Sequence, residues 1–524
     1  MSERTARRPL LLAVVALAAS LLAIVLPAAA SSAPPGCANR TNTTYQTLLQ
    51  CVTVEGVRAH QAAFQEIAND NADPFYPGTR AAGTDGYQGS VDYVAGLLED
   101  AGYDVTLDPF EFQFNFPALL HQLTPVNATY PTGSFTGSGT GDVTGAVIPV
   151  DINLTPPRAN TSGCEATDFA GLDFSGPNNI ALMQRGTCSF GIKALNAQTA
   201  GAEAVIIFNQ GNDPTREALI VGTLLPDGAA VTIPVVGGSF ANGVALAQPG
   251  STARVRVLAP ETRTDFNVIA ELEGANDENV VMAGAHLDSV TEGPGINDNG
   301  SGSAALLETA LMMARIEPEN TLRFAWWGAE EEGLIGSEAY VADQVATGDI
   351  DDIALYLNYD MVGSPNYVFF VYDGDNSDNV GAPAGPPGSK EIEDVYEAYF
   401  TARGIPYKGT DFSGRSDYGP FIATGVDIPA GGLFTGAEGI KTAEEVGLWG
   451  GIAGAQYDPC YHIACDTFAG TGSGTGSTAP GRGLIALEVN SDLIAYAQLT
   501  FAFSTETVNG VPGKPVPGSG GFTP

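Results

Sequence analysis

The pattern of hydrophobic and polar positions changes character twice along the chain. Between residues 54 and 113, apolar residues recur at helical spacing and then alternate as they do in a strand. Residues 119–160 combine Pro, Gly and Thr with short strand-like runs, and residues 178–210 then read as strand, helix and strand. From about residue 266 onward, apolar runs alternate with helical stretches such as GSAALLETALMMARI.

Strands that alternate with helices predict an α/β domain with a mostly parallel central sheet flanked by helices. The β-rich stretch in the middle interrupts this pattern, so we expect a second, inserted domain. The expected boundaries are 45–118 and 263–505 for the two parts of the main domain and 119–262 for the insert. Residues 506–524 are rich in Pro and Gly, and we expect them to form a disordered tail.

The N-terminus has the layout of a secretory signal peptide. Basic residues at positions 4, 7 and 8 precede an apolar run from Leu10 to Leu26, and small residues follow at Ala28–Ala30. The alternative is an uncleaved membrane anchor, but the run is at the short limit for a span. We therefore expect residues 1–30 to be removed and the mature protein to be secreted, extracellular and free of the membrane.

The cysteines fit an exported protein. There are six, an even number, which in an exported chain predicts disulfides. Many pairings are open, but the order along the sequence suggests three local pairs. The six are Cys37, Cys51, Cys164, Cys188, Cys460 and Cys465.

The charge of the chain excludes some partners. Its 60 Asp and Glu residues outnumber its 22 Lys and Arg residues, which gives a net charge of −38. Such a surface repels phosphates and argues against nucleic acid or an anionic membrane as the partner. It does not imply a basic substrate.

Three of the apolar runs end in side chains that bind metals. VVMAGA leads into His286 and Asp288, TLRFAWWGA leads into Glu330–Glu332, and ALYLNY leads into Asp360. Because ligands of open α/β sheets bind beyond the carboxyl ends of the strands, we expect one crevice to collect these groups together with Asp298.

Each of these residues has an ordinary interpretation when taken alone. A histidine at a strand end is often structural, an acidic triplet is often a solvated turn, and Ser301 could simply cap the next helix. Their coincidence favours a metal site. Mixed histidine and carboxylate ligands suit zinc, and Asp298 is a candidate bridge because a carboxylate can reach two ions.

Two further roles follow from position. Asp288 could orient the imidazole of His286 by accepting its other N–H. One of the adjacent glutamates could bind metal while its neighbour acts as a general base, so at least one of Glu330–Glu332 lies outside the site. DPCYHIACDT adds Tyr461 and His462, and a Cys460–Cys465 disulfide would fix the backbone that presents them; a redox or stray surface pair is the alternative. The other two histidines, at positions 60 and 121, lack such a context.

Several stretches together resemble a known family. AHLDSVTEGPGINDNGSGSA, FAWWGAEEEGLIGS, LNYDMVGSPN, SGRSDYGPF, GGLFTGA and DPCYHIACDT resemble the secreted two-zinc aminopeptidases, in the group of aminopeptidase S and aminopeptidase Y. ALMQRGTCSFGIKALNAQTAGAEAVIIFN resembles the protease-associated domain. The resemblance implies a zinc-exopeptidase fold with an inserted protease-associated domain that covers or gates the cleft or binds substrate, and it implies a disulfide between Cys164 and Cys188.

The resemblance also implies a role for each residue of the site. The two zinc ions would be bound by His286 with Asp360 and by Glu331 with His462, bridged by Asp298. The catalytic groups would be Glu330 as general base, Asp288 as orienter and Tyr461 as donor to the oxyanion. Arg415 would help to hold the free amino end of the substrate, and Met361 and Phe434 would line an apolar pocket. Tyr418 stands where relatives often have His. A calcium ion is compatible with the family, but the sequence does not place its ligands.

The function predicted in this way is that of a secreted zinc aminopeptidase. It would remove large apolar residues from the N-termini of peptides or proteins, by metal-activated water and a Glu general base, and we expect it to be a monomer. A carboxypeptidase or dipeptidase of the same fold is the main alternative. A non-enzymatic binding protein and glutaminyl cyclisation on a related fold are the others.

Overall fold

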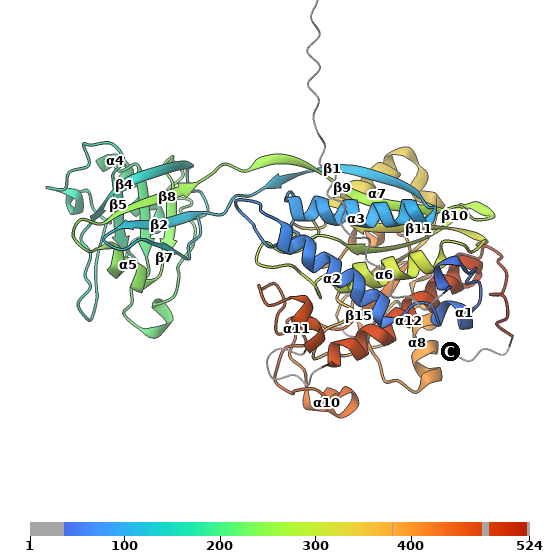
Figure 1. The fold of residues 1–524 in the computed structure, drawn as a ribbon. Coiled ribbons are helices and arrows are strands. Elements are labelled where there is room, and N and C mark those ends of the chain that lie inside the picture. Colours follow the sequence, from blue (N-terminus) through green and yellow to red (C-terminus); the bar gives the residue numbers. More distant parts are fainter. Residues whose placement is uncertain (1–35, 380, 474–480, 521–524) are drawn as a thin grey trace, which may run out of the picture.

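The computed structural model describes residues 36–379, 381–473 and 481–520, which form two domains (Figure 1). The expected signal peptide, residues 1–30, lies outside the described residues. The main domain is built on an eight-stranded sheet in the order β1-β9-β11-β10-β12-β15-β13-β14. Its strands are β1 (Asp104–Phe114), β9 (Glu261–Leu272), β10 (Asn276–His286), β11 (Asn320–Trp327), β12 (Ile353–Tyr359), β13 (Phe370–Tyr372), β14 (Lys408–Thr410) and β15 (Ala430–Phe434).

The centre of this sheet is parallel, as expected. β11, β10, β12 and β15 run side by side in the same direction, whereas β1, β9 and β13 pair antiparallel at its flanks. The four central strands are almost wholly buried, because helices cover both of their faces. Their carboxyl ends, at Trp327, His286, Tyr359 and Phe434, therefore meet at one edge of the sheet.

Helices cover both faces of the sheet. Side chains of α2, α3, α6, α8 and α12 share one large core with the sheet, and those of α7 and α9 pack in a smaller core on the opposite face. The helices of the main domain are α1 (Tyr45–Leu49), α2 (Val54–Asp70), α3 (Asp85–Ala101), α6 (Gly300–Met313), α7 (Ile335–Thr347), α8 (Ser389–Arg403), α9 (Gly419–Ile422), α10 (Ala443–Trp449), α11 (Phe468–Ser473), α12 (Arg482–Phe503) and α13 (Glu506–Asn509).

The start of α6 lies directly against the end of β12. Asn299 caps the helix by accepting a hydrogen bond from the backbone N–H of Gly302. A Cβ atom at Gly302 would lie 2.1 Å from the carbonyl oxygen of Tyr359, so only glycine permits this close approach. The glycine-rich turn of the sequence thus brings Asp298 next to the strand end that precedes Asp360.

The inserted domain carries a sheet of its own. Seven strands lie in the order β3-β2-β8-β4-β5-β6-β7, with helices α4 (Phe190–Ala200) and α5 (Phe240–Leu246). The strands are β2 (Leu119–Thr124), β3 (Ala128–Tyr130), β4 (Gly141–Pro149), β5 (Ile180–Gln184), β6 (Ala204–Phe208), β7 (Val235–Gly238) and β8 (Thr252–Val257). The domain stands to one side of the main domain, at the far end of the paired strands β1 and β9 (Figure 1).

All three expected local disulfides form. They join Cys37 to Cys51, Cys164 to Cys188, and Cys460 to Cys465. The second lies in the inserted domain, as the resemblance to the protease-associated domain implies. Within the described residues, every helix is too short or too polar to cross a membrane.

The expectation of a disordered tail is wrong for residues 506–520. Residues 506–509 form α13, and Asn509 donates a hydrogen bond to Asn279 at the start of β10 (2.7 Å). Further on, Val516 is 6% exposed within the large core. Pro and Gly indicate a segment that cannot build a core of its own. They do not prevent it from adding one apolar side chain to a core that already exists.

Replacement of Val516 by Ala tests this contact. The loss of buried methyl groups should lower the free energy of unfolding by about 1–2 kcal/mol. Val345→Ala is the control, because Val345 is 48% exposed on α7 and should not lower it. Thermal denaturation of the two variants measures the difference. Equal melting temperatures would show that the contact of Val516 with the core does not stabilise the fold.

Candidate active site

The structure brings the metal-type side chains together at the carboxyl edge of the sheet. His286 is the last residue of β10, and Asp360 directly follows β12. Glu330 and Glu331 lie in the turn after β11. Asp298 lies in the turn before α6, and His462 comes from the loop closed by the Cys460–Cys465 disulfide. The remaining predicted groups, Asp288, Tyr461, Arg415, Met361 and Phe434, lie around them.

Asp298 stands between the two histidines. One of its carboxylate oxygens is 3.3 Å from Nε2 of His286, and the other is 3.2 Å from Nε2 of His462. Nε2 of His462 is also 3.0 Å from Oε2 of Glu331, and Nε2 of His286 is 3.4 Å from Oδ1 of Asp360. The ligand atoms therefore form two groups that Asp298 joins.

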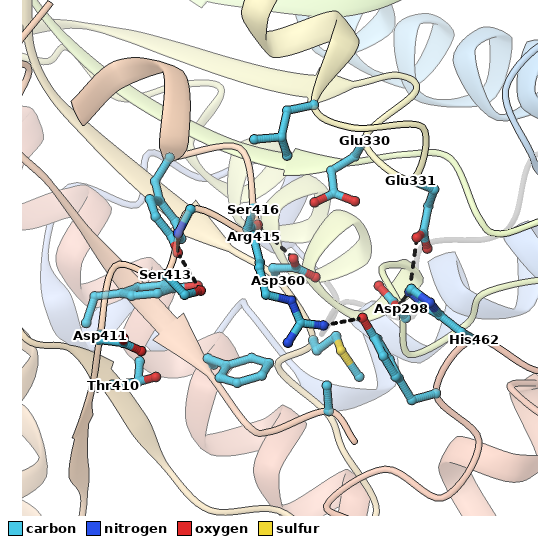
Figure 2. Close-up of a pocket in the computed structure, with 18 of the residues that line it drawn as sticks. Asp298, Glu330, Glu331, Asp360, Thr410, Asp411, Ser413, Arg415, Ser416 and His462 are labelled. Carbon is cyan, nitrogen blue, oxygen red and sulfur yellow. Dashed lines mark hydrogen bonds and ion pairs between the residues drawn. The ribbon is translucent and has the colours of Figure 1, made fainter. Parts of the chain in front are cut away.

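Glu330 belongs to the group around His286. Its Oε2 lies 4.0 Å from Nε2 of that histidine, and its side chain, with Glu331 and His462, faces a common space in Figure 2. Ligand atoms of His286, Glu330 and Asp360 lie within 4.8 Å of one another, as do those of Asp298, Glu331 and His462.

Asp288 is fully buried beneath both groups. Its carboxylate accepts hydrogen bonds from the backbone N–H groups of Glu330 and Glu331, each at 3.2 Å. Its Oδ1 is 3.6 Å from Nδ1 of His286, and its carbonyl oxygen is 3.3 Å from the same nitrogen. Asp288 thus fixes the glutamate turn as well as facing the imidazole, which is more than its sequence position indicated.

Three supporting residues escaped the prediction. Asp466 accepts hydrogen bonds from the backbone N–H of Asn297 (2.8 Å) and of Asp298 (2.9 Å), which holds the bridging turn in place. The carboxylate of Asp458 accepts a bond from the side chain of Asn297 (2.6 Å). Ser416 donates its hydroxyl to Asp360 (2.7 Å). All three lie in the quoted motifs, DPCYHIACDT and SGRSDYGPF, but their partners are distant in the sequence.

The electrostatics of the cluster show an excess of negative charge. Burial raises the pKa of Glu330 well above its usual value, and burial with the nearby charge of Asp298 raises that of Glu331 to about 7. Burial opposes the charged form of His462, but hydrogen bonds to Asp298 and Glu331 raise its pKa to about 10. The four carboxylates of the cluster therefore outnumber the two histidines that can pair with them.

The donor set fits divalent metal ions. Oε1 of Glu331 and Oδ1 of Asp360 are buried without a hydrogen-bond partner among the described residues. Buried carboxylates in proteins are normally paired or bound to a metal. Imidazole nitrogens mixed with carboxylate oxygens are ligands that zinc accepts. The residues present therefore match the metal site that the sequence predicts.

Tyr461 lies at the mouth of the site. Its ring stacks on that of His462 with 3.8 Å between the centroids, and its hydroxyl accepts a hydrogen bond from Nη2 of Arg415 (3.1 Å). Arg415 is in turn paired with Glu438 (2.9 Å), a partner that no sequence motif indicated. This arrangement leaves the tyrosine proton available for donation toward the cavity.

A cavity of about 320 Å³ opens beside the carboxylates (Figure 2). Its lining includes Met361 and Phe434, the two residues expected to form an apolar pocket, together with Tyr372 and Leu334. Tyr418 also lines it, and its hydroxyl accepts a hydrogen bond from the backbone N–H of Gly414 (2.9 Å). The tyrosine that replaces histidine therefore shapes the loop at the rim of the pocket rather than the metal cluster.

A third group of acidic residues lies outside this cavity. It consists of Asp373, Asp375 and Glu393. Oxygens of Asp373 and Glu393 accept hydrogen bonds from backbone N–H groups, among them those of Ser377 and Gly374 (2.8 Å each). The cluster is thus stabilised by the backbone itself, and we assign no calcium ion, which the resemblance allows, to this place.

The two remaining histidines are structural or exposed, as expected. His60 is buried between Tyr93 and Glu308, with 2.8 Å from Nδ1 to the tyrosine hydroxyl and 3.3 Å from Nε2 to the carboxylate. His121 lies on β2 of the inserted domain, where Nδ1 is 2.7 Å from the hydroxyl of Thr129. Neither histidine contacts a residue of the carboxylate and histidine cluster at the sheet edge.

Comparison with known proteins agrees with this geometry. A model of peptidase family M28 matches residues 267–476, and a model of the PA domain matches residues 143–246. An aminopeptidase of Pseudomonas aeruginosa (strain UCBPP-PA14) is 46% identical over 475 residues, covering 88% of this chain and 83% of the relative. The chain belongs to peptidase family M28. It is therefore a hydrolase, and the resemblance seen in its sequence is confirmed.

Other relatives agree. Leucine aminopeptidase 2 of Trichophyton equinum is 42% identical over 375 residues, covering 70% of this chain and 69% of the relative. Among solved structures, BSAP, described as a zinc aminopeptidase from Bacillus subtilis, superimposes with a TM-score of 0.54 at 23% identity. That alignment covers 85% of this chain and 94% of the other, and it shows the shared fold of this M28 peptidase.

The short disulfide beside the site yields a prediction. Replacement of both Cys460 and Cys465 by Ser should lower peptidase activity by about tenfold or more, because the loop that presents Tyr461 and His462 loses its constraint. The same double change at Cys37 and Cys51 is the matched control.

Loss of the short disulfide should lower activity more, whereas loss of the control disulfide should lower stability more. The control pair closes a longer loop, with a sequence separation of 14 against 5, so its loss should destabilise the protein more, by about 1 kcal/mol. It is remote from the cluster and should leave the rate unchanged. Rate assays and thermal denaturation of both variants check this. Equal activity of the two variants would mean that the short disulfide does not position the loop.

Proposed function

We propose that the protein is a zinc-dependent aminopeptidase that removes large apolar residues from the N-termini of peptides. The single observation that carries this proposal is the position of Asp298, whose two oxygens face two separate histidines within two groups of carboxylates. The names of the relatives in Pseudomonas and Trichophyton and that of the Bacillus structure support the same activity.

Each residue of the cluster has a role in this proposal. His286 and Asp360 would hold one zinc ion, Glu331 and His462 would hold the other, and Asp298 would serve both groups. When bound, zinc supplies Lewis-acid polarisation of the scissile carbonyl and lowers the pKa of water. Asp288 fixes the turn that carries the glutamates, and Ser416 fixes the carboxylate of Asp360.

Glu330 is the general base of this proposal. It borders the cavity, and its carboxylate accepts no hydrogen bond from the part of the chain that the structure describes, so it is free to accept the proton of the attacking water. It then passes that proton to the leaving amine. Tyr461 donates a hydrogen bond from its hydroxyl to the oxyanion that develops on the former carbonyl, and the hydrogen bond from Arg415 holds the tyrosine in position.

The polarity of the site favours an N-terminus over a C-terminus. Glu330 and Asp360 line the cavity, and carboxylates bind a free ammonium group rather than a carboxylate. Arg415 and His462 are the basic residues among the lining side chains, and both are already engaged, Arg415 by Glu438 and His462 by Asp298 and Glu331. The adjoining wall of Met361, Phe434 and Tyr372 suits the first side chain.

We further propose that the enzyme acts outside the cytoplasm. The apolar N-terminal segment with its small-residue cleavage site directs export, and three disulfides suit an oxidising compartment. The inserted PA domain stands beside the peptidase domain and is not part of its metal cluster.

The first test is an assay with leucine p-nitroanilide beside its N-acetylated form. Only the free-amine substrate should be cleaved, because the acetyl group removes the charge that the carboxylates bind. A strong chelator should abolish cleavage and added zinc should restore it, with two zinc ions per chain by mass spectrometry. Cleavage of the acetylated substrate, or activity that survives complete metal removal, would refute the proposal.

The second test concerns the general base. Glu330→Ala should lower kcat by at least about 100-fold while the zinc content is retained, because the base is lost but the assigned ligands remain. Glu332→Ala is the matched control from the same turn, and it should keep activity close to that of the wild type. A Glu330→Ala enzyme with wild-type kcat would show that the base is another residue.

A further inference from the structure

We propose that Asp411 gives the pocket for the first side chain a second specificity, so that it takes Lys and Arg as well as large apolar residues. This inference rests on the proposed aminopeptidase function and deepens it. The sequence indicated an apolar pocket formed by Met361 and Phe434. The structure adds a carboxylate to the same cavity.

The position of Asp411 suits the end of a long side chain. It directly follows β14 and lines the cavity together with Thr410 and Ser413. In Figure 2, Asp411 and Thr410 lie on the side of the pocket away from Glu331 and His462. A substrate with its amine at the metal cluster would therefore extend its first side chain toward Asp411.

The charge of Asp411 is not neutralised by the protein. Among the described residues it forms no ion pair, and its Oδ2 accepts one hydrogen bond, from the backbone N–H of Ala382 (2.9 Å). Nearby cations have other partners: Arg415 pairs with Glu438, and Lys408 pairs with Glu445 (3.0 Å). Oδ1 is left to face solvent or a ligand.

The rest of the wall fits the chemistry of a basic side chain. Lys and Arg carry an apolar stem and a charged end, and they bury the stem while the end seeks a polar partner. Met361, Phe434 and Tyr372 offer apolar surface for the stem. Asp411, with the hydroxyls of Thr410 and Ser413 beside it, offers acceptors for the ammonium or guanidinium group.

A purely structural role is the competing explanation. The hydrogen bond from Ala382 could mean that Asp411 only anchors the segment at residues 381–382. Asparagine at position 411 keeps an acceptor oxygen for this bond but removes the charge. The charge and the anchoring role can therefore be separated by a single substitution.

The experiment compares p-nitroanilides of lysine and norleucine. The two share a four-carbon stem and differ in the terminal ammonium group, so the ratio of their kcat/KM values isolates the charge. In the wild type, the lysine substrate should be cleaved within about tenfold of norleucine, since an unpaired ammonium in an apolar pocket would cost far more. Asp411→Asn should lower the lysine-to-norleucine ratio by about tenfold.

Asp378→Asn is the matched control. Asp378 accepts a hydrogen bond from the backbone N–H of Gly409 on β14 (2.7 Å) but does not line the cavity, so its loss should leave the ratio unchanged. An unchanged ratio in Asp411→Asn, or an equal fall for both substrates, would overturn the inference.

The wild type provides a test that does not depend on folding of the variant. A lysine rate below about a hundredth of the norleucine rate would also overturn the inference. Failure of the proposed function is a different result, because the wild type would then cleave neither substrate.

Discussion

The architecture of this protein depends on one electrostatic constraint, the gathering of carboxylates at the buried edge of a sheet. Glu330, Glu331, Asp298 and Asp360 lie within reach of two histidines, and burial raises the pKa of both glutamates. Hydrogen bonds hold these mutually repelling carboxylates in place. Asp288 accepts one from the backbone of Glu330, Asp466 accepts one from the backbone of Asp298, and Ser416 donates one to Asp360. Bound cations would offset the repulsion within such a set.

The same constraint explains why much of the site was predictable from the sequence. His286, the Glu330–Glu331 pair and Asp360 directly follow apolar runs, and parallel strands bring such positions to one edge. The pattern therefore predicted both the fold class and the residues that meet. The family resemblance supplied the individual roles, which residue spacing could not.

Other features could not be predicted, since they depend on contacts between distant segments. Asp466 accepts a hydrogen bond from the backbone of Asp298, 168 residues away in the sequence. The motif that contains Asp466 does not indicate this partner. Glu438 pairs with Arg415 only because two loops meet. Asp411 lies in no motif of the sequence, and only the folded structure shows that it lines the same cavity as Met361. The prediction of a disordered tail was wrong because it was based on the composition of the tail alone. Composition does not show that the main domain offers an apolar surface on which Val516 packs.

The attachment of the inserted domain has a consequence for how the chain can vary. β1 and β9 pair over their whole shared length, so Phe114 lies opposite Glu261, where the chain leaves and re-enters the sheet. β1 and β9 therefore form one long hairpin, and all the residues between Phe114 and Glu261 make up its loop. Because the entropy of closing a loop rises only slowly with its length, the sheet can accept a whole domain or a short turn there with its register intact.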